Sequence, residues 1–139
     1  MGTRVARSLG LVLVLALVAT ACSKSGNESE GGTTTIAGQE ANDHGTKDVS
    51  GESSVELEQD NFYFEPTILK GSPGQELTIE LSNEGSALHN FSIPDQSIDQ
   101  DVQPDTKGEV TVTLPDSGTL VFFCKYHQSR GMVGALEVS

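Results

Sequence analysis

The sequence has few basic residues and few residues that bind soft metals. Eight Lys and Arg stand against 20 Asp and Glu, and the formal net charge is −12. This balance argues against nucleic acid and anionic lipid headgroups as partners, because both are themselves negatively charged. The 139 residues include two Cys, three His and two Met, one of which is the initiator. Any clustering of such scarce residues is therefore informative.

The strongly apolar run LGLVLVLALVA is too short for a stable membrane span. It follows Arg4 and Arg7 and is followed by small residues and Cys22, which is the order of a secretion signal. The order resembles a bacterial lipoprotein signal, in which the cysteine becomes the first residue and carries lipid. We predict a signal peptide at 1–21 and lipidation of Cys22. The alternative is ordinary signal-peptidase cleavage nearby.

The two cysteines have different expected fates. A lipidated Cys22 cannot form a disulfide, which leaves Cys124 as a lone thiol in an oxidising compartment. An unpaired cysteine in such a compartment needs an explanation. Metal ligation supplies one, because a bound thiolate is occupied and buried.

The segment 22–53 is predicted to be a disordered polar tether. It consists mainly of Gly, Ser, Thr, Asn and acidic residues, with almost nothing apolar to bury. Such a composition cannot offset the entropy lost on ordering. His44 lies in this segment, and we expect it to be a solvated side chain without a role.

Residues 54–139 are predicted to be the folded unit, an all-β, antiparallel Greek-key β-sandwich of about seven to eight strands. The pattern has period two, as in ELTIEL and EVTVTL, and turn sequences such as GSPG separate the runs. We read 94–107 as a crossover loop with at most one helical turn. The expected strands are 55–59, 62–65, 75–82, 88–93, 108–114, 118–124 and 133–138.

The stretch FCKYHQSRGM concentrates three metal-binding side chains. Cys124 is expected to end a strand with its sulfur on the core face, since it alternates in phase with Leu120 and Phe122. His127 and Met132 follow in the loop and at the next strand. His89, in ALHNFSI, is the candidate fourth ligand. Two imidazoles, a thiolate and a weak thioether define a type 1 (blue) copper site, so we predict one Cu(I)/Cu(II) ion as cofactor.

Residues 54–139 resemble a cupredoxin of the plastocyanin-like group, whose ligand loop reads Cys-x₂-His-x₄-Met-x-Gly. Cys124, His127, Met132 and Gly134 match this loop, and His89-Asn90 matches the upstream motif. The resemblance implies that the Asn90 backbone donates a hydrogen bond to the thiolate and that its side chain ties the two ligand segments together. It also implies that His127 reaches the surface through an apolar patch, to which Met132, Val133 and Pro94 would contribute.

Tyr126 departs from the family pattern, which usually has proline before the second histidine. Proline has no backbone N–H, and Tyr126 restores one near the sulfur. We hypothesise that this N–H stabilises the electron-rich thiolate and lowers the reduction potential of the copper.

The expected function is one-electron transfer between extracytoplasmic redox partners, such as a cytochrome or a membrane oxidase or reductase. The alternative is a lipoprotein for copper storage, delivery or homeostasis. We expect no enzymatic turnover, because multicopper enzymes need further histidine clusters and His44 is the one histidine left. We expect a monomer. The lipoprotein resemblance implies that it is lipid-anchored on the extracytoplasmic face of a bacterial cell membrane or in the periplasm.

Overall fold

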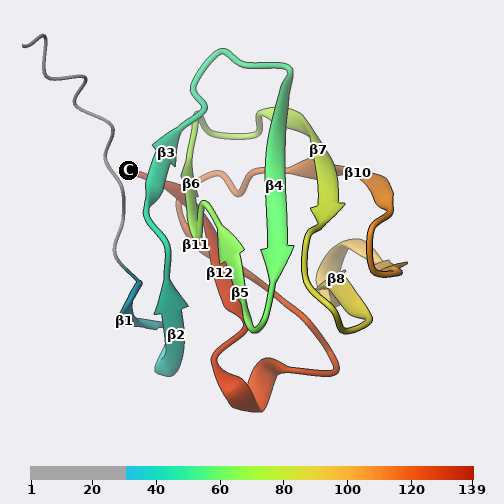
Figure 1. Cartoon of the computed structure of the whole chain (residues 1–139). Helices are drawn as coiled ribbons and strands as arrows, with labels where there is room; N and C mark the ends of the chain where they lie inside the picture. The colour runs from blue at the N-terminus through green and yellow to red at the C-terminus, as the bar shows by residue number, and fades with distance from the viewer. Residues whose placement is uncertain (1–30) are drawn as a thin grey trace, which may run out of the picture.

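The computed structural model describes residues 31–139. The predicted signal peptide, Cys22 and the first residues of the predicted tether lie outside this range. Among the described residues, no helix is both long enough and apolar enough to cross a membrane. Residues 31–139 form twelve strands and two single-turn 3-10 helices (Figure 1). The elements are β1 (Gly32–Ile36), β2 (Gln39–Asp43), β3 (Thr46–Asp48), β4 (Ser54–Asp60), β5 (Tyr63–Glu65), β6 (Ile68–Lys70), β7 (Glu76–Asn83), β8 (His89–Ile93), η1 (Pro94–Gln96), β9 (Ile98–Val102), β10 (Lys107–Thr113), β11 (Gly118–Phe123), η2 (Gln128–Arg130) and β12 (Val133–Val138).

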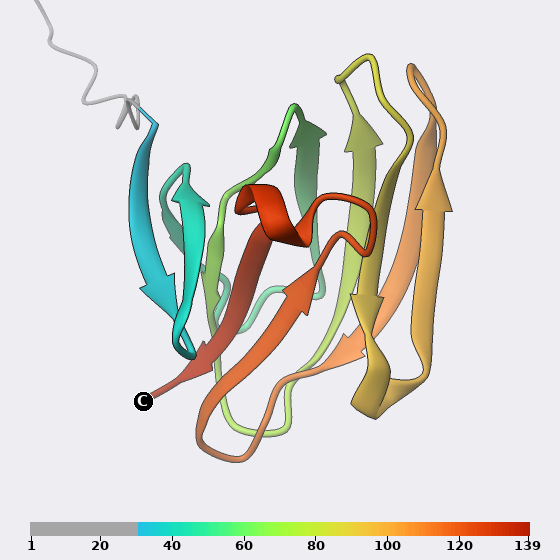
Figure 2. The same cartoon turned by 90° about the horizontal axis from the view of Figure 1, so that it is seen from below.

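Two sheets form the predicted sandwich. The smaller has the strand order β10-β7-β4-β5, the larger has the order β3-β6-β12-β11-β8-β9, and β1 and β2 make a separate hairpin (Figure 2). Most pairings are antiparallel, but β4–β7, β6–β12 and β3–β6 are parallel. The predicted all-β sandwich is confirmed. The strand number is higher than the expected seven to eight, because the β1–β2 hairpin and the strands β3, β6 and β9 of the larger sheet were not expected.

The core between the sheets is built from the alternating residues. Leu77, Ile79 and Leu81 on β7 are fully buried, whereas Glu80 between them is exposed. Three phenylalanines, Phe64, Phe91 and Phe122, join the two sheets, with ring centroids 4.8–6.1 Å apart. Cys124 and Met132 belong to this same buried cluster. The sulfur-bearing residues are therefore continuous with the core.

The prediction of a tether over 22–53 is wrong for its described part, 31–53, and the folded unit does not begin at residue 54. Strands β1, β2 and β3 occupy this part, and β3 pairs in parallel with β6 along the edge of the larger sheet. Ile36 and Ala41 pack against Val133 and Ala135 of β12 in a second, smaller apolar cluster. Average composition hid this outcome, because a few apolar residues at the right positions suffice to bury one face of a hairpin.

His44 is likewise not the solvated side chain that we expected. Its ring stacks on Tyr63 with centroids 3.4 Å apart and an interplanar angle of 8°. Its Nδ1 lies 3.7 Å from Oε2 of Glu65. His44 thus helps to hold the N-terminal segment against β5.

The predicted crossover loop 94–107 is also wrong over residues 98–102, which form β9. This edge strand pairs with β8 along its whole length, from Ile93↔Ile98 to His89↔Val102. The single helical turn that the sequence allowed is η1. Two prolines and many acidic residues concealed the strand, yet charged side chains are typical of an edge strand that must not pair further.

An Ile36→Ala substitution tests the corrected boundary. Ile36 is 4% exposed in the small cluster, so its truncation should lower the free energy of unfolding by about 2 kcal/mol or more. Thr35→Ala is the control, because Thr35 is exposed on the same strand and should change stability by less than about 0.5 kcal/mol. Urea denaturation measures both. Equal stabilities for the two variants would restore the tether interpretation.

Candidate metal centre

The segment 124–132 is closed by backbone hydrogen bonds between its two ends. The Cys124 N–H donates to the Met132 carbonyl at 3.0 Å, and the Met132 N–H donates to the His127 carbonyl at 3.2 Å. The His127 N–H donates to the Cys124 carbonyl at 3.0 Å. Strands β11 and β12 pair directly on either side, ending at Phe123↔Val133. The loop is therefore anchored at both ends, and Met132 lies opposite Cys124.

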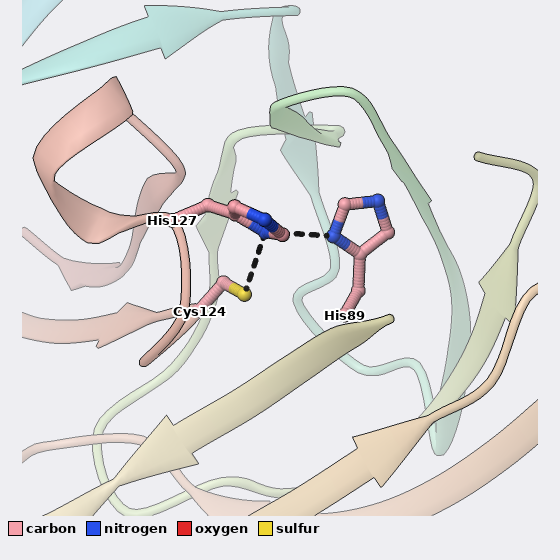
Figure 3. Close-up of side chains that lie close together, drawn as sticks. All are labelled: His89, Cys124 and His127. Atoms are coloured by element: carbon pink, nitrogen blue, oxygen red, sulfur yellow. Dashed lines mark hydrogen bonds between the residues drawn. The ribbon is translucent and has the colours of Figure 1, made fainter. Parts of the chain in front are cut away.

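Three of the predicted ligands converge in space (Figure 3). The Nδ1 atoms of His89 and His127 are 3.3 Å apart, and the Cys124 Sγ lies 3.5 Å from the His127 Nδ1. All three donor atoms lie within 4.8 Å of one another, and residues 31–139 contain no other such His, Cys or carboxylate group. His89 comes from β8, whereas Cys124 and His127 come from the loop after β11. Met132 is fully buried, and its backbone is hydrogen-bonded to that of Cys124 and that of His127.

Burial sets the protonation of the donors. Burial, aided by nearby His127, lowers the pKa of His89 from 6.5 to about 4. Burial and then the Arg130 charge lower the pKa of His127. Burial raises the pKa of the Cys124 thiol, and the backbone N–H groups of Tyr126, His127 and Asn90 oppose it as hydrogen-bond donors. The imidazoles are thus neutral and ready to bind metal at neutral pH, and a cation would favour the thiolate.

The surroundings of His89 also fit a metal ligand. Its Nε2 is buried without a hydrogen-bond partner, while its Nδ1 faces the other donors. The ring packs closely against Gly85, because a Cβ added there would lie 2.8 Å from the Nε2. Glycine is therefore needed for this ring position. Two neutral imidazoles, a buried thiol and a buried thioether make a soft donor set that fits one type 1 copper ion.

Asn90 connects the two ligand segments, as the resemblance implied. Its Oδ1 accepts from the Lys125 N–H at 3.3 Å, next to Cys124. Its Nδ2 donates to the carboxylates of Asp99 and Asp101 at 2.7 and 2.8 Å. Lys125 Nζ lies 2.6 and 3.1 Å from the same two carboxylates. The side chain is consequently held from both sides, and Asn90 cannot turn away from the sulfur without breaking several bonds.

Tyr126 contributes through its backbone and its hydroxyl separately. Its N–H is the first of the hydrogen bonds that lower the pKa of Cys124, in line with the sequence-based hypothesis. Its hydroxyl donates to Asp101 Oδ2 at 2.8 Å, and the side chain is 45% exposed. The Asp101 carboxylate therefore holds the side chains of both Asn90 and Tyr126, and the backbone N–H groups of these two residues are hydrogen-bond donors to the Cys124 thiol.

Sequence reasoning missed several residues at the centre. Phe62 packs on the His127 ring at 4.4 Å, and the Arg130 guanidinium lies 4.6 Å from the Phe62 ring. The expected contribution of Met132 and Val133 to an apolar surface patch is wrong, because both are fully buried. Pro94, also expected there, is exposed, and Phe62 packs beside His127. Alternation in IDQDV was a signal for Asp99 and Asp101, but no sequence signal marked Phe62.

Comparison with known proteins agrees with the fold. The cupredoxin-like domain model matches residues 11–135, and the chain belongs to this family. No curated protein sequence matches the chain.

Solved structures share the fold at low identity. A chain of a heme-copper terminal oxidase dimer is 19% identical with a TM-score of 0.54, and the match covers 64% of this chain and 66% of that one. Auracyanin from the photosynthetic bacterium Roseiflexus castenholzii is 17% identical with a TM-score of 0.52, covering 63% and 98%. The metal-binding domain of the Cu(I)-exporting P-type ATPase of Streptococcus pneumoniae D39 is 12% identical with a TM-score of 0.53, covering 67% and 96%. At these identities the likeness establishes the fold.

A Gly85→Ala substitution should weaken copper binding by displacing His89. The added Cβ would lie 2.8 Å from the His89 Nε2 and 2.9 Å from the Asn61 Oδ1. We expect copper affinity to fall about 10–100-fold, the usual cost of disturbing a residue that supports a ligand. Competition with a chelator of known affinity measures it. Gly32→Ala is the control, since a Cβ there meets nothing within 4 Å. Unchanged affinity in a folded Gly85→Ala variant would contradict the role of Gly85.

A Tyr126→Pro substitution should raise the reduction potential of the bound copper. Proline removes the N–H that stabilises the thiolate and, with it, Cu(II). Tyr126→Phe separates the two roles of the residue, because it removes only the hydroxyl bond to Asp101. Redox titration of the visible absorption gives both potentials. A proline variant whose potential does not exceed that of the phenylalanine variant would refute the hypothesis.

Proposed function

We propose that this protein is a one-electron carrier with a single type 1 copper site. His89, Cys124 and His127 would be the equatorial ligands and Met132 the weak axial one. The observation that carries the proposal is the convergence of three donors within 4.8 Å in a buried position. Copper bound there supplies a Cu(I)/Cu(II) couple.

Rigidity of the donors supports electron transfer. Cu(I) and Cu(II) prefer different geometries, so a site that holds one compromise arrangement needs little rearrangement when an electron arrives or leaves. Here Cys124, His127 and Met132 are tied by three backbone hydrogen bonds, and His89 lies on the strand β8. Each ligand is held by the sandwich before any metal binds.

The exposure of the ligands favours a carrier over copper delivery. His89, Cys124 and Met132 have no exposed surface, and only His127 of the four is partly exposed. Delivery to a target requires the target's ligands to reach the metal. An electron needs only close approach, and the His127 edge beside Phe62 would provide the route.

Turnover of a substrate is not part of the proposal. Multicopper enzymes need further histidine clusters, and the third histidine, His44, stacks on Tyr63 instead of joining the described donor group. We therefore place the chain among carriers, with the redox partners being extracytoplasmic proteins.

Anchoring at the membrane remains a proposal that rests on the lipoprotein-like sequence before Cys22. The described fold begins at Gly31, so eight residues, 23–30, lie between it and Cys22, and nine Cα–Cα steps join the two positions. A fully extended stretch of that length spans about 30 Å. Gly31 lines the same surface hollow as Asn42 and Phe62, next to the His127 edge. A lipid at Cys22 would hold the copper end close to the membrane and raise its effective concentration near membrane redox complexes.

Addition of Cu(II) to the purified protein tests the function. We expect an intense visible band from thiolate-to-copper charge transfer, and its complete loss in Cys124→Ser. His44→Ala is a matched control, because it removes a histidine outside the donor group and should keep the band. A colourless protein at full copper occupancy would overturn the proposal.

A further inference from the structure

The N-terminal hairpin β1–β2 lies beside the metal-binding loop (Figure 2). Its apolar face covers Val133 and Ala135 at the start of β12, directly after Met132. The Asn42 N–H on β2 donates to the Gly131 carbonyl at 2.9 Å, within the loop itself. The hairpin therefore reaches a part of the chain that carries ligands.

The Asn42 side chain bridges two segments that are distant in sequence. Its Nδ2 donates to the carbonyl of Phe62, in the turn between β4 and β5, at 2.8 Å. The same Nδ2 donates to the carbonyl of Arg130, in the loop, also at 2.8 Å. Both amide hydrogens are used, and a Cβ at Gly131 would lie 3.0 Å from the amide. The fit leaves little freedom for either segment.

The two bridged segments lie around His127, the partly exposed ligand. The Phe62 ring packs on His127 at 4.4 Å, and the Arg130 guanidinium covers Phe62 at 4.6 Å. Asn42 holds both residues through hydrogen bonds to their backbone carbonyls. Movement of either segment would open one side of the imidazole.

We propose that Asn42 is a positioning residue for the copper site. Through it the hairpin clamps the β4–β5 turn to the ligand loop, so that His127 keeps one orientation and the metal stays closed to outside ligands. This inference rests on the proposed copper function for its effect on the metal. The mechanical part, the clamp on the loop, holds in the metal-free protein as well.

The test compares Asn42→Asp with Gln39→Glu. Aspartate has nearly the shape of asparagine but places acceptor oxygens against the Phe62 and Arg130 carbonyls, so both bonds are lost. Gln39→Glu makes the same charge change on the same hairpin, and its carboxylate still accepts the hydrogen bond that Gln128 now donates to Oε1 at 2.7 Å. Asn42→Ser is the second variant, because it replaces the two amide donors by a single hydroxyl donor on a shorter side chain, so the two carbonyls can no longer be bridged. It adds no charge and keeps the backbone bond to Gly131.

Two measurements separate the clamp from the copper function. In the metal-free protein, amide hydrogen exchange at His127 and Met132 should become about tenfold faster in both Asn42 variants and stay unchanged in Gln39→Glu. In the copper-loaded protein, release of the metal to an excess chelator should become about tenfold faster in the Asn42 variants alone, with the visible band retained. Unchanged loop exchange in Asn42→Ser would overturn the clamp, whether or not the wild-type protein turns blue. A colourless wild-type protein would count against the copper function alone.

Discussion

Burial of the Cys124 thiol is the constraint on which the metal centre depends. A thiol with no exposed surface resists ionisation, and its pKa is raised accordingly. The neighbouring imidazoles are kept neutral by the same exclusion of water. A site of neutral donors around a buried sulfur gains most from a soft cation, since binding converts the thiol to a thiolate and releases a proton. Burial of the thiol in the core therefore affects the protonation of the metal ligands as well as the stability of the fold.

Backbone N–H groups around the Cys124 sulfur partly offset the effect of burial on its pKa. Three N–H groups oppose the rise in the Cys124 pKa, and those of Asn90 and Tyr126 are held in place by the edge strand β9. Asp99 and Asp101 hold the Asn90 amide, and Asp101 also accepts from the Tyr126 hydroxyl. Hydrogen bonds donated mainly by Lys125 lower the pKa of the Asp99 carboxyl, and those donated by Asn90 and then Tyr126 lower the pKa of the Asp101 carboxyl, so both are ionised at neutral pH. The edge strand β9 thus positions the residues that surround the buried Cys124 sulfur.

The N-terminal hairpin gives the centre a second support, on the opposite side from β9. Strand β9 braces the Cys124 end of the loop through Asn90, and β2 braces the Gly131 end through Asn42. Each brace uses one asparagine, whose amide can donate and accept at once in a small volume. The partly exposed ligand His127 lies between these two supports.

Local pattern was enough to predict the strands that make up the core. Alternation in ELTIEL and EVTVTL places apolar side chains on one face of a strand whatever the partner strand is, and β7 and β10 follow it. The spacing of Cys124, His127 and Met132 in one loop likewise needed no tertiary information to suggest metal binding. His89 was a candidate fourth ligand from its place on another expected strand, and the His-Asn motif of the resembling family then agreed with it.

What the sequence determined by itself were the strands with strong alternation and the chemistry of the ligand loop, since both depend on residues close in the chain. Only the tertiary structure decided the roles of β1 to β3, of β9, and of Phe62, Gly85, Asp99 and Asn42. Their contacts join segments far apart in sequence: Asn42 meets Arg130 across 88 positions. A short strand with few apolar residues folds only because the sheet it joins supplies the buried surface and the hydrogen-bond partners. That information is spread over the whole chain.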